Sequence, residues 1–421
     1  MAATNQQAYR VFGIRDYALY FTSRTSVNIA ITMLSTVIGW QVYAITHNVL
    51  SLGLVGLAEF IPAVSIALVG GYFADTYNRR YIIIISEIVF FLCVLTLLVI
   101  TTQFENFLKL NGLGIVYTII GLTGFVRGFL GPAQSSFASQ LIPPEMFVNA
   151  STWNTTSWHL ANIGGPAIGG LLYAVSGNAN LAYFTIIVLI LNGLFFISRT
   201  KNYPLTQKEK SEGETFISKV KEGLHFVFAR QLILGSLALD MFAVLFGGAV
   251  AMLPAYAKDI LFLGPEGLGF MRTAPAIGAL LMSGILAYNP IKNNAGYLLL
   301  CAVGGFGICT ILFGISQNFW FSIIMLAGTG FFDNISMVVR GTIVQKYTPN
   351  EMRGRVSAVN ALFVGSSNEL GAFESGVAAR YMGLIPSVVF GGIMTLIVVA
   401  IAWFAAPKLR KLDFTVASEL V

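Results

Sequence analysis

Long apolar runs alternate with short polar turns along the whole chain. Each run holds about 20 or more mostly apolar residues, enough for a helix to cross about 30 Å of hydrocarbon at about 1.5 Å per residue. Helices are expected because a backbone exposed to lipid must pair its N–H and C=O groups internally. The pattern predicts an all-α polytopic membrane protein with twelve transmembrane helices at residues 17–46, 51–73, 81–102, 113–142, 151–176, 179–198, 230–257, 266–289, 296–316, 319–347, 356–382 and 384–406.

One polar stretch, Arg199–Glu222, is much longer than the other turns and separates six apolar runs from six. It predicts an N-terminal six-helix bundle at residues 1–198, a cytoplasmic linker at 199–229, and a C-terminal six-helix bundle with a short tail at 230–421. Within the linker, Thr215–Ala229 has the pattern of an amphipathic helix that lies on the membrane surface.

A segment of the first half is repeated in the second half. Thr123–Gly177 aligns without a gap on Thr329–Gly383, 206 positions later, with 12 identities in 55 positions. Inside the predicted membrane region Arg127 aligns with Asp333, so the two copies carry opposite charges at one depth. A duplicated membrane bundle with charges near its middle is the usual build of a secondary transporter.

The charge content agrees with a membrane protein and sets its orientation. Charged residues make up 10% and hydrophobic residues 56% of the chain, and its mean hydropathy is +0.76, whereas a soluble domain carries about 25% charged residues. Eighteen Lys and Arg residues fall on one predicted side, and only Lys109, Lys258 and Arg380 fall on the other. The positive-inside rule then predicts a multi-pass membrane protein with both termini in the cytoplasm.

Several classes of function are excluded. The net charge of +6 is not clustered on a soluble face, which argues against nucleic acid as a partner. Cys93, Cys301 and Cys309 lie inside apolar runs and are expected to pack without a disulfide or a metal ion. No P-loop, metal-spaced His/Cys cluster or nucleophile motif is present in the sequence, so we expect neither an enzyme nor a cofactor. The first apolar run contains Arg24, which is unlike a signal peptide, so this helix is expected to remain.

The turn after the second run resembles the signature loop of the major facilitator superfamily, Gly-x-x-x-Asp-x-x-Gly-Arg-Arg/Lys. It reads Gly71-Tyr-Phe-Ala-Asp75-Thr-Tyr-Asn-Arg79-Arg80, with Asn78 in the place of the second Gly. Asn tolerates a left-handed backbone nearly as well as Gly does, so the motif is expected to keep its shape. The resemblance implies two pseudo-symmetric six-helix bundles, with helices 1, 4, 7 and 10 around a central cavity. It also implies a gating loop of Gly71, Asp75, Arg79, Arg80, Arg353 and Arg355.

The fifth predicted helix is similar to the Gly-Pro-x-x-Gly-Gly signature of the superfamily's antiporters, through Gly165, Pro166, Gly169 and Gly170. Gly165, Pro166 and Gly169 are expected to face the eighth helix. Phe12–Arg24 and Glu351–Asn360 resemble the drug:proton antiporter branch that includes the enterobactin exporter and macrolide efflux pumps.

The resemblance to this branch implies a proton-coupled monomeric transporter that exports a siderophore or drug-like compound by alternating access. Its partners would be that small molecule, protons and the lipid bilayer. An importer, an uncoupled facilitator of a small metabolite, and a non-transporting receptor or scaffold are the alternatives.

Charged residues inside the predicted helices are the main candidates for mechanism, because each costs at least about 2.5–3.5 kcal/mol at the bilayer centre. A buried carboxylate can take up and release protons, and Asp333, on a cavity-lining helix, is the first choice. Asp240 comes next and is expected to be held ionised by Arg24, whereas Glu87 is expected to be a structural partner of the cytoplasmic loops. The proton-coupling candidates are Asp333, Asp240, Glu369, Glu374 and Glu59; the substrate and cavity candidates are Arg24, Arg127, Arg272, Arg340, Trp158, His159, Asn162 and Phe331.

Overall fold

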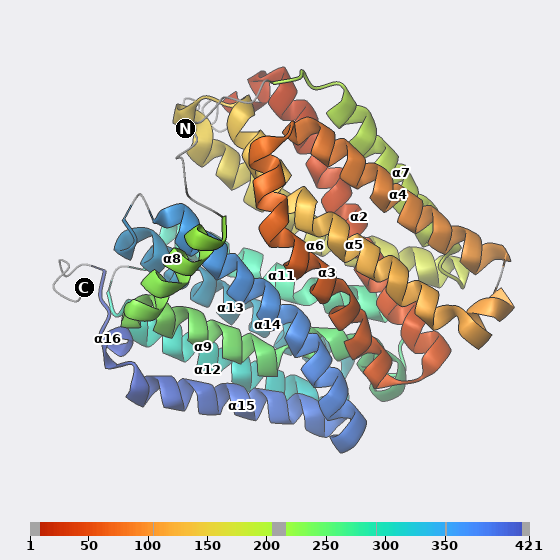
Figure 1. Ribbon diagram of the computed structural model, residues 1–421. Coiled ribbons are helices and arrows are strands. Elements are labelled where there is room, and N and C mark those ends of the chain that lie inside the picture. Colours follow the sequence, from red (N-terminus) through yellow and green to blue (C-terminus); the bar gives the residue numbers. More distant parts are fainter. Residues whose placement is uncertain (1–8, 104, 204–215, 292, 350–351, 415–421) are drawn as a thin grey trace. The chain divides into compact units, whose positions relative to one another are not determined.

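A computed structural model describes residues 9–103, 105–203, 216–291, 293–349 and 352–414 (Figure 1). The described residues contain helices and no strand, as the apolar pattern predicts. Tertiary contacts divide the chain into two compact units. The first comprises Met1–Ile45, Ala58–Lys210 and Gly264–Gly269, and the second comprises Thr46–Leu57, Ser211–Leu263 and Phe270–Val421.

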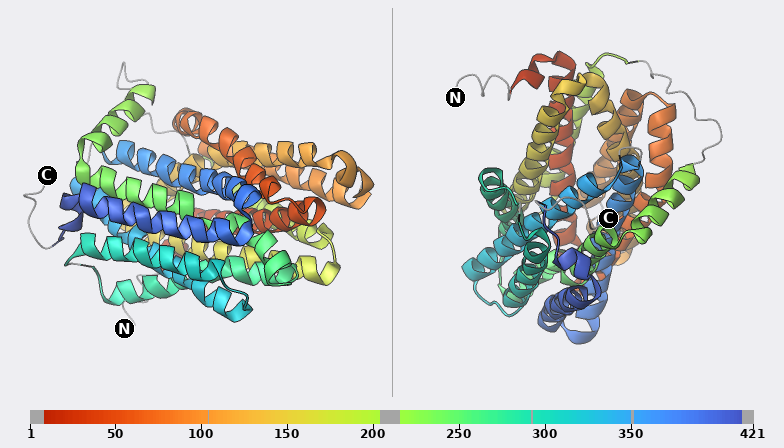
Figure 2. Two further views of the ribbon diagram at one scale, coloured as in Figure 1. Left: turned by 90° about the horizontal axis from the view of Figure 1, so that it is seen from below. Right: turned by 90° about the vertical axis from the view of Figure 1, so that its left-hand side faces the viewer.

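The first unit is built on long helices packed side by side (Figures 1 and 2). In it α4 packs against α5 and α7, and α6 packs against α7. The helices of the first half are α2 (Arg15–Thr46), α3 (Val49–Thr76), α4 (Arg79–Gln103), α5 (Glu105–Leu141), α6 (Phe147–Ser176) and α7 (Asn180–Ser198).

The second unit has a continuous apolar core in which α9 packs against α14 and α15, and α12 packs against α13 and α15. The helices of the second half are α8 (Phe216–Ala229), α9 (Gln231–Gly247), α10 (Leu253–Ala255), α11 (Pro265–Tyr288), α12 (Ala295–Gly314), α13 (Phe319–Tyr347), α14 (Arg353–Met382), α15 (Leu384–Ala405) and α16 (Pro407–Arg410). The tail after α15 belongs to this core, because Leu409 and Leu412 are fully buried.

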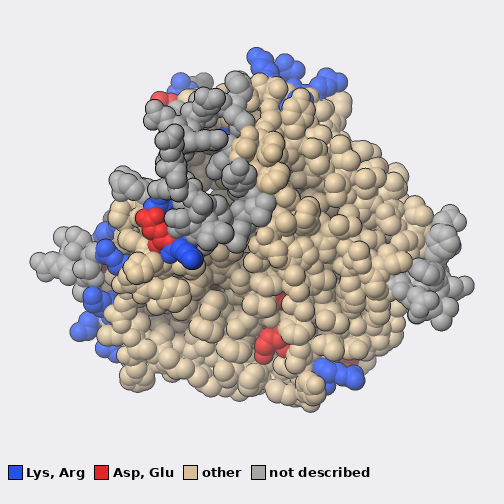
Figure 3. Space-filling view, in the orientation of Figure 1, with Lys and Arg blue, Asp and Glu red and all other residues tan. Residues whose placement is uncertain are grey.

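Each of the twelve predicted spans coincides with helix, but the helices differ in polarity. Ten among the described residues are long and apolar enough to cross a membrane. The two predicted spans outside that set are α6 and α14, which belong to the repeated segment. The visible face of the molecule is mostly uncharged, with its charged side chains in a few small groups (Figure 3).

The division into units differs from chain order at two helix ends. The start of α3 packs with the second unit, and the start of α11 packs with the first. The domain boundaries expected from the linker, at 198 and 230, follow chain order and stay a prediction.

The seventh predicted span, 230–257, coincides with the apolar span Gln231–Ile260, but its helix is not continuous. Helix α9 ends at Gly247, and short 3-10, α and π turns follow from Ala249 to Ile260. Gly248 and Pro254 favour this break, because Gly weakens a helix and Pro cannot donate its backbone hydrogen bond. The buried Tyr256 stabilises it: its hydroxyl lies 2.6 Å from the carbonyl oxygen of Gly314, at the end of α12.

Two of the identities in the repeated segment are glycines that end helices. Gly177 and Gly383 are aligned identities, and both have positive φ, +68° and +89°, directly after α6 and α14. A residue with a Cβ would be strained at either position.

Asn78 in the signature loop lacks the left-handed backbone expected of it. Its side-chain oxygen instead accepts a hydrogen bond from the backbone N–H of Arg80 at 3.1 Å and so caps the start of α4.

The linker helix forms as predicted but packs on protein. In α8, Val227 is fully buried in the core of the second unit. A Cβ on Gly223 would lie 3.0 Å from the carbonyl oxygen of Arg355, so α8 and α14 approach closely there. One face of the helix is therefore committed to α14, and its position on the membrane surface stays a prediction.

Candidate functional site

The second unit contains a buried ion pair between α9 and α13. The Asp240 carboxylate contacts the Arg340 guanidinium, and their side chains are 7% and 9% exposed. The Ser336 hydroxyl donates a hydrogen bond to Asp240 Oδ1 at 3.3 Å. This second donor matters because a buried carboxylate needs more than one partner to replace its lost hydration. The expected pairing of Asp240 with Arg24 is wrong, because Arg340 occupies that role.

Asp333 lies beside this pair. Residues 333, 336 and 340 are three and seven positions apart, so α13 places all three on one face. Asp333, Asp240 and Ser336 line one small cavity, together with apolar side chains such as Phe332. Among the described residues the Asp333 side chain makes no ion pair or hydrogen bond. The structure thus brings together a neutralised carboxylate and one whose charge is not neutralised.

In the first unit a different pair joins α3 to α5. The Glu59 carboxylate contacts the Arg127 guanidinium, and the Arg127 side chain is 40% exposed against 17% for Glu59. The helices can approach because Gly124 lies directly against the backbone of Glu59. Two sequence-predicted candidates, one for protons and one for substrate, therefore neutralise each other here.

Arg24 is held inside the first unit through tyrosine. Its Nη1 donates to the Tyr20 hydroxyl at 2.9 Å, and that hydroxyl donates to the carbonyl oxygen of Gln134 at 2.9 Å. Arg24 Nε is buried without a hydrogen-bond partner in the described part of the chain. The charge is therefore desolvated but not neutralised, which suits an anionic group of a ligand.

Glu87 is more deeply placed than its position near the cytoplasmic turns predicts. It is 0% exposed on α4, where the Ser23 hydroxyl of α2 donates to its Oε1 at 3.2 Å. Glu87 Oε2 is buried and has no hydrogen-bond partner among the described residues. Its expected role as a partner of the loops is therefore wrong. The missed signal was Ser23, one of the small polar residues along the first helix.

The other intramembrane candidates are more scattered. Glu369 on α14 lies beside Gly56 of α3, and its Oε2 would be 3.5 Å from a Cβ placed there. Glu374 on α14 and Arg272 on α11 are half-buried. On α6, His159 is half-buried, Trp158 is exposed, and Asn162 donates to the carbonyl oxygen of Trp158 at 2.9 Å.

Phe331 takes a different position from the other aromatic candidate. It packs edge-on against Phe332 in the second unit's core, with ring centroids 5.5 Å apart. Trp158 remains the more accessible of the two for a ligand.

The predicted gating loop consists mostly of helix. Helix α3 continues through Gly71 and Asp75 to Thr76, and only two residues separate it from α4. Arg79 donates to the carbonyl oxygen of Ala74 at 2.9 Å and to that of Ser136 at 3.2 Å, while Arg80 donates to that of Ser198 at 2.5 Å. Both arginines therefore satisfy helix C-termini, where cations are favoured.

The acidic and C-terminal members of the gating set are placed only in part. The side chains of Asp75 and Arg353 lie outside the described part of the structure. Arg355, at the start of α14, forms an ion pair with Glu222 of the linker helix at 2.5 Å. The linker helix thus contacts the start of α14, which carries the last two members of the predicted gating set.

The antiporter-type glycines contact two different helices. A Cβ on Gly165 would lie 2.9 Å from the Ile29 carbonyl oxygen, and one on Gly169 would lie 2.9 Å from Met33 Cγ, so both face α2. For these two glycines the expected contact with the eighth helix is wrong, whereas Pro166 does lie against it. Gly170 does face α11, where a Cβ would lie 2.9 Å from Gly269 Cα, and the Pro166 carbonyl lies beside Gly269.

The described residues contain no group of three or more His, Cys, Asp or Glu side chains that could hold a metal ion. The three cysteines are free thiols, two buried and one exposed.

Comparison with known proteins agrees with this architecture. The family described as transmembrane secretion effector matches residues 8–419. The enterobactin exporter EntS of Shigella dysenteriae serotype 1 is 25% identical over 409 residues, which cover 91% of this chain and 92% of EntS. The uncharacterized MFS-type transporter YfmI of Bacillus subtilis (strain 168) is 21% identical over 411 residues, covering 94% of this chain and 97% of YfmI.

Solved structures share the fold at low identity. A D-xylose-proton symporter superposes with a TM-score of 0.71 at 14% identity, covering 94% of this chain and 99% of the symporter. A bacterial homologue of the iron transporter ferroportin superposes with a TM-score of 0.67 at 16% identity, over 94% and 99% of the two chains. With the family match across almost the entire sequence, the chain belongs to the transmembrane secretion effector family of the major facilitator superfamily, whose members are membrane transporters and not enzymes.

Proposed function

We propose that this transporter exports a small organic molecule, a siderophore or drug-like compound, in exchange for protons, with Asp333 as the proton carrier. The observation that carries the proposal is the contrast on α13. Asp240 is neutralised by Arg340, whereas Asp333 lines the same cavity and makes no ion pair among the described residues. A carboxyl whose charge no fixed cation balances is the kind of group that proton exchange requires.

Proton exchange needs a group that is neutral in one state and charged in the other. Asp333 meets this requirement if its access to water changes during alternating access, in which the carrier opens to each side of the membrane in turn. Arg340 and Arg127 cannot meet it, because guanidinium groups stay protonated. Glu59 is a weaker candidate than Asp333, since it is already paired with Arg127.

The direction of transport is inferred from two supports. EntS, which matches nearly the full length of the chain, is an exporter. The distribution of Lys and Arg supports an orientation in the inner membrane with both termini in the cytoplasm. The half-buried Arg24, held by Tyr20, could receive an anionic group, as a catecholate siderophore would supply.

The test is Asp333→Asn in purified protein reconstituted into liposomes. A catecholate siderophore and a fluorescent cationic dye serve as probes, and internal pH is followed with a pH-sensitive dye. We expect the variant to keep probe exchange between equal concentrations. Uphill transport and probe-driven proton movement should each fall by at least about tenfold, a factor that corresponds to about 1.4 kcal/mol.

Glu374→Gln is the matched comparison, since Glu374 is another intramembrane carboxyl on a different helix. If Glu374→Gln uncouples transport and Asp333→Asn does not, the carrier lies on α14. If the unsubstituted protein moves a probe only down its gradient, with no proton movement, it is an uncoupled facilitator. Accumulation in the opposite direction would make it an importer.

A further inference from the structure

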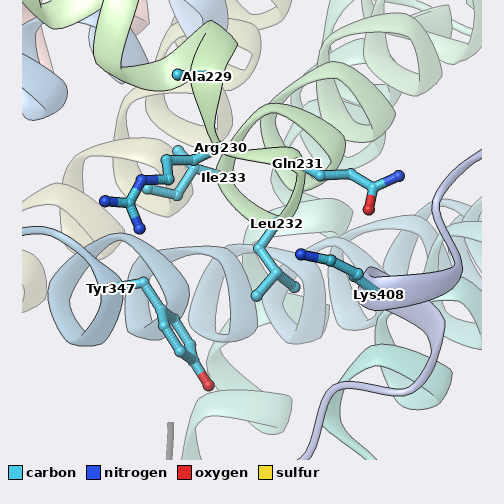
Figure 4. Close-up of a pocket in the computed structure, with 7 residues that line it drawn as sticks. All are labelled: Ala229, Arg230, Gln231, Leu232, Ile233, Tyr347 and Lys408. Atoms are coloured by element: carbon cyan, nitrogen blue, oxygen red, sulfur yellow. The ribbon is translucent and has the colours of Figure 1, made fainter. Parts of the chain in front are cut away.

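We propose that a pocket at one end of the second unit binds the phosphate group of an anionic phospholipid. The pocket lies where the joint between α8 and α9 meets the last residue of α13 and the start of α16 (Figure 4). Its polar lining comes from Arg230, Gln231, Tyr347 and Lys408, and its apolar lining includes Leu232 and Ile233. None of these residues takes part in the proposed proton step.

The lining carries two positive charges and no negative one. Arg230 and Lys408 come from separate elements, and Figure 4 shows them on either side of Leu232, with the ring of Tyr347 on the Arg230 side. Neither cation forms an ion pair among the described residues. The Arg230 guanidinium lies over the ring of Phe226, 5.2 Å from its centroid, which leaves its N–H edge available.

The Asp413 carboxylate is near enough to Tyr347 to act on it electrostatically, but it does not line the pocket, and the neighbouring cations have other partners. The Asp413 carboxylate accepts a hydrogen bond from the backbone N–H of Asn294 at 3.2 Å, and Lys346 donates to the carbonyl oxygen of Phe414 at 2.7 Å. Arg410 lies over the ring of Trp403, 5.0 Å from its centroid. The side-chain amide of Gln231 donates to the Ala405 carbonyl oxygen at 3.2 Å. Arg230, Lys408 and the Tyr347 hydroxyl remain as donors for a ligand.

The location identifies the ligand as a lipid. Three apolar spans end at this pocket: Gln231–Ile260 begins there, and Phe319–Tyr347 and Leu384–Ala405 end beside it. The ends of such spans lie at the depth of lipid headgroups, where Lys and Arg attract anionic lipids. Leu232 and Ile233 offer an apolar surface to the glycerol and first acyl carbons. A zwitterionic headgroup would bring its own cation against Arg230 and Lys408, so a headgroup with a net negative charge is favoured.

The experiment uses the full-length protein, purified in a neutral detergent and freed of bound lipid. Short-chain phosphatidylglycerol is titrated in, and binding is followed by native mass spectrometry and by the change in melting temperature. Each cation near an anionic lipid contributes about a fivefold gain in affinity. Arg230→Gln with Lys408→Gln is therefore expected to weaken binding by roughly 25-fold.

Two variants serve as controls. Arg230→Lys with Lys408→Arg keeps both charges and should keep most of the binding, which separates lost charge from lost folding. Arg410→Gln removes a nearby cation that does not line the pocket and should leave binding unchanged.

The proposal is overturned if phosphatidylcholine with the same acyl chains binds as tightly as phosphatidylglycerol. Equal losses in Arg410→Gln and in the double Gln variant would also overturn it, because they would mean diffuse attraction only. Inorganic phosphate is the third ligand to be tested. If it binds as tightly as the lipid and depends on Arg230 and Lys408, the ligand is a soluble phosphate compound and the lipid assignment is wrong.

Discussion

The two copies of the repeated segment keep the same packing but use their charges differently. In the first copy, Arg127 on α5 pairs with Glu59 on α3, and the pair is partly exposed. In the second copy, the residue aligned with Arg127 is Asp333 on α13. The arginine of α13 is Arg340, about two turns further along the helix, and it pairs with Asp240 of α9. Duplication has therefore preserved the helix contacts while the position, burial and sign of the charges diverged.

The helix contacts that the two copies share are made at aligned glycines. Gly170 of α6 and Gly376 of α14 are aligned identities, and each meets another glycine on a neighbouring helix. Gly170 approaches Gly269 within the first unit, and Gly376 approaches Gly53 within the second. Close backbone contact depends on the absence of a Cβ, so it tolerates little change. Charges are replaced more readily, and this freedom would let one half supply the proposed proton carrier.

The largest expected effect is the loss of the buried pair in the second unit. Asp240→Asn should destabilise the protein by about 3–5 kcal/mol, because Arg340 would stay buried without a counter-charge. Thermal unfolding of the purified variant in detergent measures this. The double variant Asp240→Leu with Arg340→Met should lose less than either single change. A melting temperature unchanged by Asp240→Asn would mean that Arg340 finds another partner, and the contrast between the copies would fail.

The shared glycine contact should give the next largest effect, and it should be similar in both copies. Gly170→Val and Gly376→Val each place a side chain against backbone 2.9 Å from the Cβ position, at a cost of about 1–3 kcal/mol or more. Gly164→Val is the matched control, since the nearest atom to its Cβ is Ile168 Cδ1 at 4.0 Å. The measurements are the transport rate and the melting temperature of each of the three variants. Equal losses in Gly164→Val and Gly170→Val would show that the whole segment resists bulk for another reason.

A smaller effect is expected from the pair in the first copy. Glu59→Gln should cost only about 0.2–1 kcal/mol, because the Arg127 side chain is 40% exposed and keeps part of its solvation. The measurement is thermal unfolding in the same detergent as for Asp240→Asn. A loss as large as that of Asp240→Asn would remove the difference in burial that separates the two copies.

The smallest expected effect concerns the segment after α7, which is tied to the first unit. The Tyr203 hydroxyl donates to Asp16 Oδ2 at 2.7 Å, and partial burial together with this carboxylate raises the pKa of Tyr203 to about 12. Since this pKa is raised above its ordinary value, the hydrogen bond should stabilise the protein fully below about pH 10 and lose its effect as the pH rises through about 12.

Tyr203→Phe tests this titration directly. At about pH 11 an ordinary tyrosine is mostly ionised, so removing one would lower the tyrosinate absorbance of the folded protein. Because Tyr203 should still be protonated there, the absorbance of Tyr203→Phe should match that of the unsubstituted protein. A clear decrease at this pH would show that Asp16 does not hold the phenol.

Helix positions were predictable because the length and polarity of each run are fixed by the bilayer, and the structure places most ends within a few residues of the expected ones. The break in the helix after Gly247 was not predictable, because the residues that follow it are as apolar as those before it. Hydropathy reports burial and says little about backbone path. Asn78 shows a similar limit: its suitability for a left-handed turn was a property of the residue type, whereas its use as a helix cap depends on where α4 begins.

The charged site was predictable in its members but not in its pairs. The cost of intramembrane charge identified Asp240, Asp333 and Arg340, yet several cations could have served Asp240. The spacing of Asp333, Ser336 and Arg340 on one face of α13 was readable from the sequence and would have favoured Arg340 over Arg24. The burial of Glu87 was harder to foresee, because it depends on how α2, α4 and α7 pack together.

The fully buried Leu409 and Leu412 have a consequence for biosynthesis. They follow α15, and the backbone N–H of Gly296 donates to the Leu412 carbonyl oxygen at 3.1 Å. Because chains are made from the N-terminus and fold as they emerge, the core of the second unit cannot close until Leu412 has been made. Until then its helices stay incompletely packed in the membrane, open to quality-control proteases, so a stop codon before Leu409 should yield a short-lived product.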